Sequence, residues 1–198
     1  MRRRLVVVMA RWPAAGRCKR RLSTGLGSQR AAAVQQGLLR HTLAVLHQAC
    51  CPIGADRRLA VAGVGPRAAA RLHQGSVVLQ GQGGLGLRMQ RQFGWAFRQG
   101  YQQVLLLGSD LPQLSAADLQ QAFAALQRAP LVLGPATDGG YWLIGLRRSA
   151  PPLFAGVAWG SDSVLQETVA RATSLGLPAA LLHCRHDLDR PGDLLRWR

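Results

Sequence analysis

Hydrophobic and polar positions follow two patterns along this chain. Short continuous apolar runs are typical of strands buried in a parallel sheet, and apolar residues spaced three and four apart are typical of amphipathic helices. The runs predict strands at residues 4–9, 58–62, 76–79, 104–107, 131–134, 141–146 and 180–184. The helical spacing predicts helices near residues 28–50, 66–73, 87–99, 115–128 and 161–175. This alternation predicts a three-layer α/β/α sandwich around a mostly parallel sheet, as a single domain over residues 1–198.

Local signals mark several helix ends. Ser115 and Asp118 stand three residues apart before an apolar stretch, which is typical of a capping box. Cys51 and Pro52 predict the end of the helix at residues 28–50. Asp118 and Asp162 are expected in the first turns of their helices, where a negative charge offsets the helix dipole. Helix geometry therefore accounts for these two acids without a role in chemistry.

The composition suits a globular protein. Of the 198 residues, 48% are hydrophobic, and no apolar run approaches the roughly 18 residues of a membrane helix. The first run, LVVVMA, is shorter than the roughly 7–15 residues of a signal-peptide core, so we expect a buried strand there and a cytoplasmic protein. The four cysteines form no CxxC pair, which argues against a zinc site.

The positive charge is unevenly distributed. The formal net charge is +16, and residues 1–109 contain a single acid, Asp56, so the excess lies in that part of the chain. One interpretation is a site for a polyanion such as a nucleotide, and the other is a solvated basic surface that reflects an arginine-rich composition. No aromatic stacking platform or zinc-finger spacing accompanies the arginines, so nucleic-acid binding is not the expected main function.

One loop concentrates this charge. The segment MARWPAAGRCKRRL, residues 9–22, holds the only lysine of the chain, Lys19, among Arg17, Arg20 and Arg21. Cations crowded into one loop without a nearby acid in the sequence are relieved by solvent or by an anion such as a phosphate chain. The loop lacks the GxxxxGK[ST] pattern of a P-loop, and the later GQGGLG follows the third predicted strand, which is the wrong place for a dinucleotide fingerprint.

Asp110 is the strongest candidate for chemistry among the acids. It directly follows VLLLGS, at the carboxyl end of a predicted central strand, where α/β sheets bind their ligands. A carboxylate there suits a divalent cation that bridges phosphate oxygens. The alternative is a turn residue that bonds its own backbone ahead of Leu111 and Pro112.

Two further segments carry candidate residues. Asp138 begins a tight Asp-Gly turn, and the following Gly139, Gly140, Tyr141 and Trp142 combine a close backbone approach with aromatic walls for a substrate pocket.

The second segment is HDLDRPGDLL near the end of the chain. Asp187 and Asp189 stand two apart, and one of them, preferably Asp189, is a candidate second metal ligand. Asp189 could instead cap the last helix, with Asp193 in its first turn.

Six motifs in order resemble one protein family. MARWPAAGRCKRRL is similar to A-K-x-P-x-x-G-x-V-K-T-R-L, and GQGGLGLRM is similar to G-x-G-D-L-G-x-R-M. GSDLPQLS, LGPATDGGYWLIGL, LFAGVAWGSDSVL and DLDRPGDL resemble the remaining blocks. Over nearly its full length the chain resembles the bacterial radical-SAM/selenodomain-associated transferases, also labelled arsenosugar-biosynthesis glycosyltransferases, which have the GT-A fold.

The resemblance implies a nucleotide-diphospho-sugar transferase fold, a nucleotide held by the first loop, and a divalent cation (Mg²⁺ or Mn²⁺) held by Asp110 and Asp189. Asp110, Asp138 and Lys19 are the implied catalytic residues. The implied nucleotide- or substrate-binding residues are Ala10, Pro13, Gly16, Lys19, Arg21, Gly86, Arg88, Ser109, Gly139, Gly140, Tyr141, Trp142 and Trp159. Arg20, Gly84 and Gly160 depart from the family motifs, where threonine, aspartate and serine are usual.

Three functions remain open from the sequence. Glycosyl transfer from a nucleotide sugar to a small-molecule acceptor is favoured by the family label. Nucleotidyl transfer from an NTP to a phosphate or carboxylate substrate is favoured by the Lys19–Arg21 loop, which resembles the K-[ST]-R-L of guanylyltransferases from deazaflavin-cofactor biosynthesis. A non-catalytic nucleotide or polyanion binder is the third. We expect a metal-dependent transferase and prefer glycosyl transfer.

Overall fold

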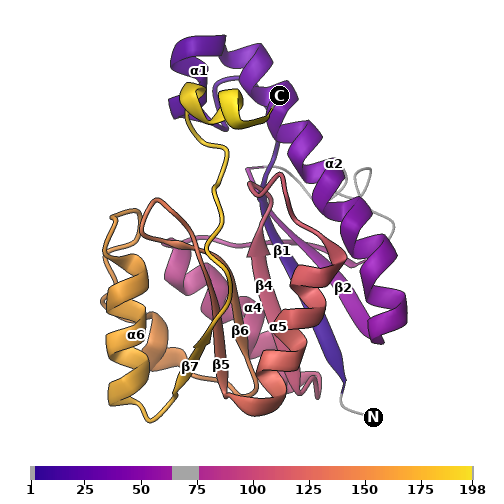
Figure 1. Ribbon diagram of the computed structural model, residues 1–198, viewed down its shortest axis with the longest axis vertical. Helices are drawn as coiled ribbons and strands as arrows, with labels where there is room; N and C mark the ends of the chain where they lie inside the picture. Colours follow the sequence, from indigo (N-terminus) through magenta and orange to yellow (C-terminus); the bar gives the residue numbers. More distant parts are fainter. Residues whose placement is uncertain (1–2, 64–75, 198) are drawn as a thin grey trace.

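The protein is a seven-stranded sheet between helices, seen in a computed structural model that describes residues 3–63 and 76–197 (Figure 1). The strands are β1 (Arg4–Arg11), β2 (Ala55–Ala62), β3 (Ser76–Leu79), β4 (Gln103–Gly108), β5 (Leu131–Pro135), β6 (Tyr141–Leu146) and β7 (Ala179–Leu181). Their order is β3-β2-β1-β4-β6-β5-β7. Only β6 runs antiparallel to its neighbours among these strands, so the expected mostly parallel sheet is confirmed.

The helices cover both faces of the sheet. They are α1 (Arg20–Leu26), α2 (Ser28–Ile53), α4 (Leu85–Arg98), α5 (Ala116–Arg128) and α6 (Val164–Ser174), with 3-10 turns η1 (Pro151–Phe154) and η2 (Pro191–Trp197). Side chains alternate across β1: Val6 and Val8 pack with α2 and α5, whereas Leu5 and Val7 pack with α4, η1 and α6. The expected three-layer sandwich is therefore confirmed.

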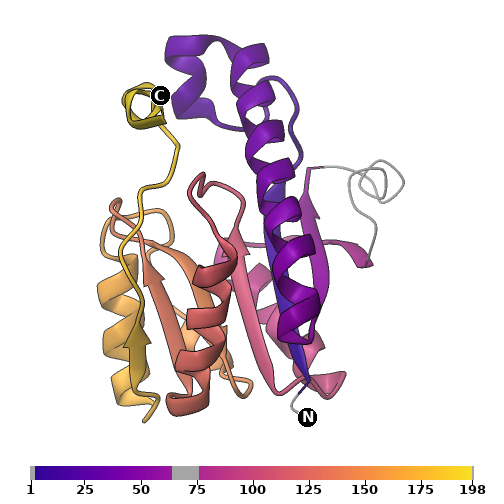
Figure 2. The ribbon, with the colours of Figure 1, turned by 45° about the vertical axis from the view of Figure 1, so that its right-hand side comes forward.

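A small cap stands beyond the carboxyl ends of the parallel strands. Figures 1 and 2 show α1, the start of α2 and η2 together above the sheet. Leu22 and Leu38 of these helices enclose Leu188, which is 2% exposed. The Leu188 N–H also donates to the Asp110 carbonyl at 3.0 Å. The burial of Leu188 and this hydrogen bond together hold residues 187–193 over the ends of β1 and β4.

Most element bounds agree with the sequence pattern to within two residues, and five elements differ. One is β7, which was expected to reach residue 184 and ends at Leu181. Helix α1 begins inside the segment expected to be a loop, and β2 starts three residues early, at Ala55. Helix α2 continues through Pro52 to Ile53 and ends where Gly54 takes a left-handed φ of 67°. Helix α6 starts only at Val164. The helix expected at residues 66–73 lies outside the described residues.

The late start of α6 corrects the expectation for one acid. Asp162 precedes the helix, and the acid of the first turn is Glu167. The Glu167 carboxylate accepts hydrogen bonds from the Ser163 hydroxyl at 2.6 Å and from the Ala158 backbone N–H at 2.9 Å, so it holds the loop before the helix. These bonds hold the pKa of Glu167 below its usual value.

A helix that crosses a lipid bilayer must be both long and apolar. Among the helices in the described residues, none has the length and apolar character needed to cross a membrane.

The capping box of α5 allows a test of the local structure. The Ser115 hydroxyl accepts from the Asp118 N–H at 3.4 Å, and the Asp118 carboxylate accepts from the Ser115 N–H at 2.9 Å. We predict that Ser115→Ala lowers the free energy of unfolding by about 1 kcal/mol in urea titrations. Ser28→Ala, at the start of α2 where no side chain caps the helix, serves as the matched control and should change stability little. Equal losses in the two variants would contradict the capping assignment.

Candidate functional site

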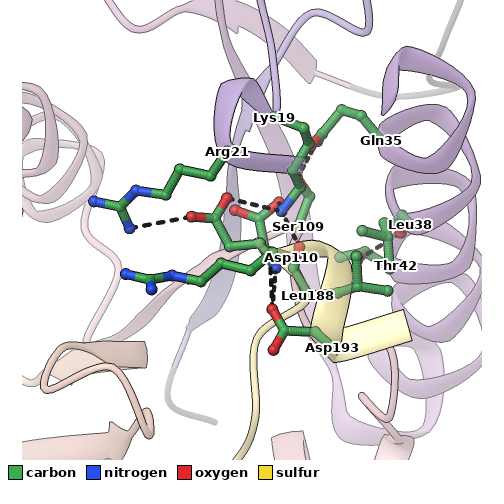
Figure 3. Close-up of polar contacts among 11 residues, drawn as sticks. Lys19, Arg21, Gln35, Leu38, Thr42, Ser109, Asp110, Leu188 and Asp193 are labelled. Carbon is green, nitrogen blue, oxygen red and sulfur yellow. Dashed lines mark hydrogen bonds and ion pairs between the residues drawn. The ribbon is translucent and has the colours of Figure 1, made fainter. Parts of the chain in front are cut away.

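Lys19 connects three distant segments at the carboxyl edge of the sheet. It precedes α1 in a left-handed conformation with φ 47°, and its side chain is only 3% exposed. The ammonium donates to the Leu188 carbonyl at 2.5 Å and lies 2.9 Å from Asp110 Oδ1 and 3.8 Å from Asp189 Oδ1 (Figure 3). The sequence suggested that cations of this loop would lack acidic partners, and that expectation is wrong for Lys19. Its partners come from far along the chain.

Arg21 is the second cation held in this way. Its guanidinium lies 3.3 Å from Asp189 Oδ2, in a half-exposed pair. Asp193 then accepts the backbone N–H groups of Asp189 at 2.9 Å and Arg190 at 2.7 Å. Asp193 therefore lies in the first turn of η2, as expected, and holds the two residues before it, and the Asp189 carboxylate faces Lys19 and Arg21.

The end of β4 presents Asp110 next to a fixed neighbour. Ser109 is buried, and its hydroxyl accepts from the Gln35 amide of α2 at 2.9 Å (Figure 3). The Asp110 side chain remains 45% exposed and pairs with Lys19. Gln35 holds the Ser109 side chain, and the Leu188 N–H holds the Asp110 carbonyl. These two hydrogen bonds fix the position of the Asp110 carboxylate at the end of β4.

Asp187 is a residue that the sequence analysis weighed and did not prefer. Its Oδ1 is buried and has no hydrogen-bond partner among the described residues. Burial first, and then the negative charges of Asp110, Asp138 and Asp189, raise the pKa of Asp187 to about 7, against the opposing charge of Lys19. The Asp-x-Asp spacing was the available signal, but the sequence could not show which of the two carboxylates is buried.

A cavity of about 770 Å³ opens beside these residues. Nine of the predicted site residues line it: Ala10, Lys19, Arg21, Arg88, Ser109, Asp110, Tyr141, Trp142 and Asp189. The sequence analysis did not assign several other lining residues to the site, among them Arg11, Arg20, Gln35, Gln80, Met89 and Asp187. Burial raises the pKa of the Tyr141 phenol, and Trp142 is buried with its indole N–H donating to the His183 carbonyl at 3.3 Å.

The other predicted residues do not line this cavity. Pro13 and Gly16 lie in the loop after β1, and Gly16 takes φ 72°. Gly86 is buried, and a Cβ on it would stand 2.5 Å from Trp159 Nε1, so Gly86 and Trp159 pack against each other.

The glycines after Asp138 serve the turn itself. Gly139 takes φ 86°, and a Cβ there would collide with the backbone of Asp162. Gly140 N–H donates to Asp138 Oδ1 at 3.0 Å. A ligand was expected to approach the backbone at these glycines. At Gly139 the backbone of Asp162 occupies that space instead.

Asp138 lines a second, smaller cavity of about 390 Å³. Its walls include Arg21, Asp187 and Asp189, which also border the larger cavity. The two cavities therefore adjoin at the carboxylates.

The carboxylates suit a hard divalent cation in their chemistry. Asp110 and Asp189 both lie within 4 Å of one nitrogen, Lys19 Nζ, and the buried Asp187 Oδ1 lacks a partner among the described residues. Over residues 3–63 and 76–197, no three His, Cys, Asp or Glu side chains form a complete metal-binding group. The donor set fits a cation that takes its remaining ligands from a diphosphate or water.

Comparisons place the chain in a family. The profile of a family described as uncharacterized protein conserved in bacteria (DUF2064) matches residues 42–161, and the chain belongs to this family. A candidate nucleotide-diphospho-sugar transferase from Desulfovibrio desulfuricans G20 is 30% identical, with a TM-score of 0.85 over 96% of this chain and 84% of its own. No curated protein matches.

More distant structures share the fold. A 4-diphosphocytidyl-2C-methyl-D-erythritol synthase from Anaerococcus prevotii is 11% identical, with a TM-score of 0.64 over 98% of this chain and 96% of its own. Glucosyl-3-phosphoglycerate synthase from Mycobacterium tuberculosis, in complex with Mn²⁺, UDP and glucosyl-3-phosphoglycerate, is 13% identical, with a TM-score of 0.59 over 98% of this chain and 75% of its own. These two neighbours show a shared fold. The expectation of a transferase is confirmed at the level of the enzyme class by the 30% identical Desulfovibrio relative.

The burial of Asp187 predicts a pH-dependent stability. Its carboxyl binds a proton more tightly in the folded protein, with a pKa of about 7, than in the unfolded chain, where 3.8 is usual. Folded stability therefore falls as the pH rises from about 4 through 7. We predict that Asp187→Asn removes this loss and is more stable than the wild type above pH 7, by roughly 1 to 4 kcal/mol, the upper figure corresponding to the whole difference between the two pKa values.

Urea titrations between pH 4 and 8 in a metal chelator measure the effect. Asp56→Asn, a change of the same kind at an exposed acid, should keep the wild-type dependence on pH. An unchanged pH dependence in Asp187→Asn would contradict the assignment.

Proposed function

We propose that the protein is a metal-dependent glycosyltransferase that moves a sugar from a nucleotide sugar to a small-molecule acceptor. The carrying observation is that Asp110, Asp189 and Lys19 converge at the carboxyl edge of the sheet, beside a cavity with further cations in its wall. Anionic diphosphates suit that wall, and the adjoining carboxylates suit a cation bound to them. We also propose that the protein is associated with radical-SAM or selenodomain proteins and that it is located in the cytoplasm.

Asp110 and Asp189 are the proposed ligands of Mg²⁺ or Mn²⁺, with Asp187 beside them. A divalent cation supplies neutralisation of the negative charge that develops on the departing diphosphate. The Mn²⁺ and UDP bound by the mycobacterial glucosyl-3-phosphoglycerate synthase support this choice. Lys19, placed between the Asp110 and Asp189 carboxylates, offsets the repulsion between their charges.

The cationic residues are assigned to the phosphates. Lys19, Arg21 and Arg88 border the large cavity, and their positive charges stabilise the diphosphate as it leaves. Lys19 offers a compact ammonium that can stay bonded to a carboxylate while it also contacts an oxygen of the ligand. Tyr141 and Trp142 form an aromatic wall, and Asp138 in the adjoining cavity is the proposed general base.

Nucleotidyl transfer is the second candidate. The cation-rich loop from Lys19 to Arg21 favours it, because an NTP brings more phosphate charge to the site than a nucleotide sugar does. The cytidylyltransferase fold of the Anaerococcus neighbour is compatible with it. In this reaction pyrophosphate leaves, and the nucleotidyl group joins a phosphate or carboxylate of the second substrate.

Nucleotide binding is the first test. We predict that a panel of nucleoside diphosphates and triphosphates contains a member that raises the melting temperature with Mn²⁺, by linkage of binding to folding. Asp110→Asn retains an acceptor for Lys19 but removes the charge, so the Mn²⁺-dependent part of the shift should be lost. Asp56→Asn is the matched control and should respond like the wild type. A panel without any stabilising nucleotide would contradict both enzyme functions.

Product analysis separates the two reactions. Free nucleoside diphosphate formed from a sugar nucleotide supports glycosyl transfer, and pyrophosphate formed from an NTP supports nucleotidyl transfer.

Lys19→Arg tests the need for an ammonium. The Arg side chain is larger and planar, and the Lys19 site is buried, so we predict a folded variant with turnover lowered roughly 10- to 100-fold. Arg17→Lys, in the same loop on an exposed residue outside the cavity, is the control and should leave kcat and KM unchanged. Full turnover in Lys19→Arg would show that any cation suffices there.

A further inference from the structure

The second cavity differs in charge from the rest of the chain. Five of the eight aspartates of the sequence border it, and its cations are two arginines. The aspartates are Asp138, Asp162, Asp187, Asp189 and Asp193, and the arginines are Arg21 and Arg190. In a chain with a formal net charge of +16, such a lining is the opposite of what the overall composition would supply.

The larger cavity has the reverse balance. Arg11, Lys19, Arg20, Arg21 and Arg88 border it, against three aspartates. The two cavities share Arg21, Asp187 and Asp189, so a cation-rich space and an acid-rich space meet at a common wall. An anionic ligand is therefore attracted to the first space and repelled by the second.

Negative charge dominates the interior of the second cavity. Arg21 is already paired with Asp189 at 3.3 Å, in the wall that the two cavities share. The Asp138 carboxylate accepts the Gly140 N–H at 3.0 Å, and Asp162 is exposed with its backbone against Gly139 of the same turn. A phosphate or carboxylate entering here would meet more carboxylates than cations.

The polar groups of the lining suit hydroxyl donors. Carboxylates only accept hydrogen bonds, and the Ser161 hydroxyl of the lining already donates to the Ala158 carbonyl at 2.8 Å, which leaves its oxygen as an acceptor. A ligand rich in hydroxyl groups, or one with an ammonium group, can donate to several of these oxygens at once. A cavity of about 390 Å³ has room for a molecule of the size of one sugar ring.

We propose that the second cavity is the acceptor site and that it takes an uncharged or cationic polyhydroxylated acceptor, excluding acceptors whose reacting end is a phosphate or carboxylate. This inference rests on the proposed transferase function and narrows it to transfer onto a hydroxyl. The acceptor oxygen forms the bond to the anomeric carbon, and the bond from that carbon to the diphosphate breaks, its electron pair leaving on the diphosphate. The hydroxyl proton passes to the Asp138 carboxylate and then to solvent.

Ligand-observed NMR with three probes of similar shape tests the proposal on the whole protein. The probes are glucosamine, glucose and glucuronate, and inorganic pyrophosphate is present to occupy the cation-rich cavity. We expect glucosamine to bind most tightly, glucose to bind detectably, and glucuronate to give no signal once pyrophosphate is bound. Asp162→Asn, which removes one charge but keeps the polar side chain, should weaken glucosamine by up to about fivefold and leave glucose nearly unchanged.

Charge reversal gives the sharper contrast. Asp162→Lys should abolish glucosamine binding and let glucuronate bind in the presence of pyrophosphate. Asp56→Lys, a reversal at an exposed acid of β2 outside both cavities, should leave all three probes as in the wild type. Circular dichroism and the melting temperature verify that each variant is folded.

Two results would overturn the proposal. One is glucuronate binding to the wild type that survives pyrophosphate and is changed by the Asp162 variants. The other is absence of glucosamine binding, or glucosamine binding that is indifferent to both Asp162 variants. A failure of the proposed transferase function would instead appear as a lack of nucleotide stabilisation, which these probe measurements do not involve.

Discussion

The buried ammonium of Lys19 is the interaction on which the candidate site depends. It joins the loop after β1, the end of β4 and the segment that follows β7, through Asp110, Leu188 and Asp189. Removal of its charge would leave Asp110 and Asp189 repelling each other at the edge of the sheet. Because an ammonium has three donors and no plane, it can bond Leu188 and Asp110 while its charge attracts Asp189 at 3.8 Å. The arginines of this chain could not replace it there without a change in geometry.

Positive and negative side chains are unevenly distributed around the site. Cations border the larger cavity and acids border the smaller one, so the sheet edge separates two electrostatic environments over a short distance. The overall charge of +16 conceals this separation, because most of the arginines lie outside the cavities. The composition described a basic protein, whereas the folded site combines a basic compartment with an acidic one.

Local patterns were enough to predict the strands and the layered fold, since apolar runs such as VVV and VLLL leave few alternatives to buried strands. The Ser115–Asp118 cap and the place of Asp110 also followed from neighbours in sequence. The ion pairs could not be predicted in this way, because Lys19 and Asp189 are far apart in the sequence and the burial of Leu188 brings them together. Helix α1 was missed because arginine and lysine at its start look like a solvated loop.

The position of Leu188 also bears on how the protein is made. It is held between Leu22 and Leu38, and it carries two carboxylates into the site from a segment that follows every strand of the sheet. During synthesis the sheet can form while Lys19 and Asp110 still lack their third partner. The nascent chain is therefore unable to assemble the site until residues 187–193 have left the ribosome.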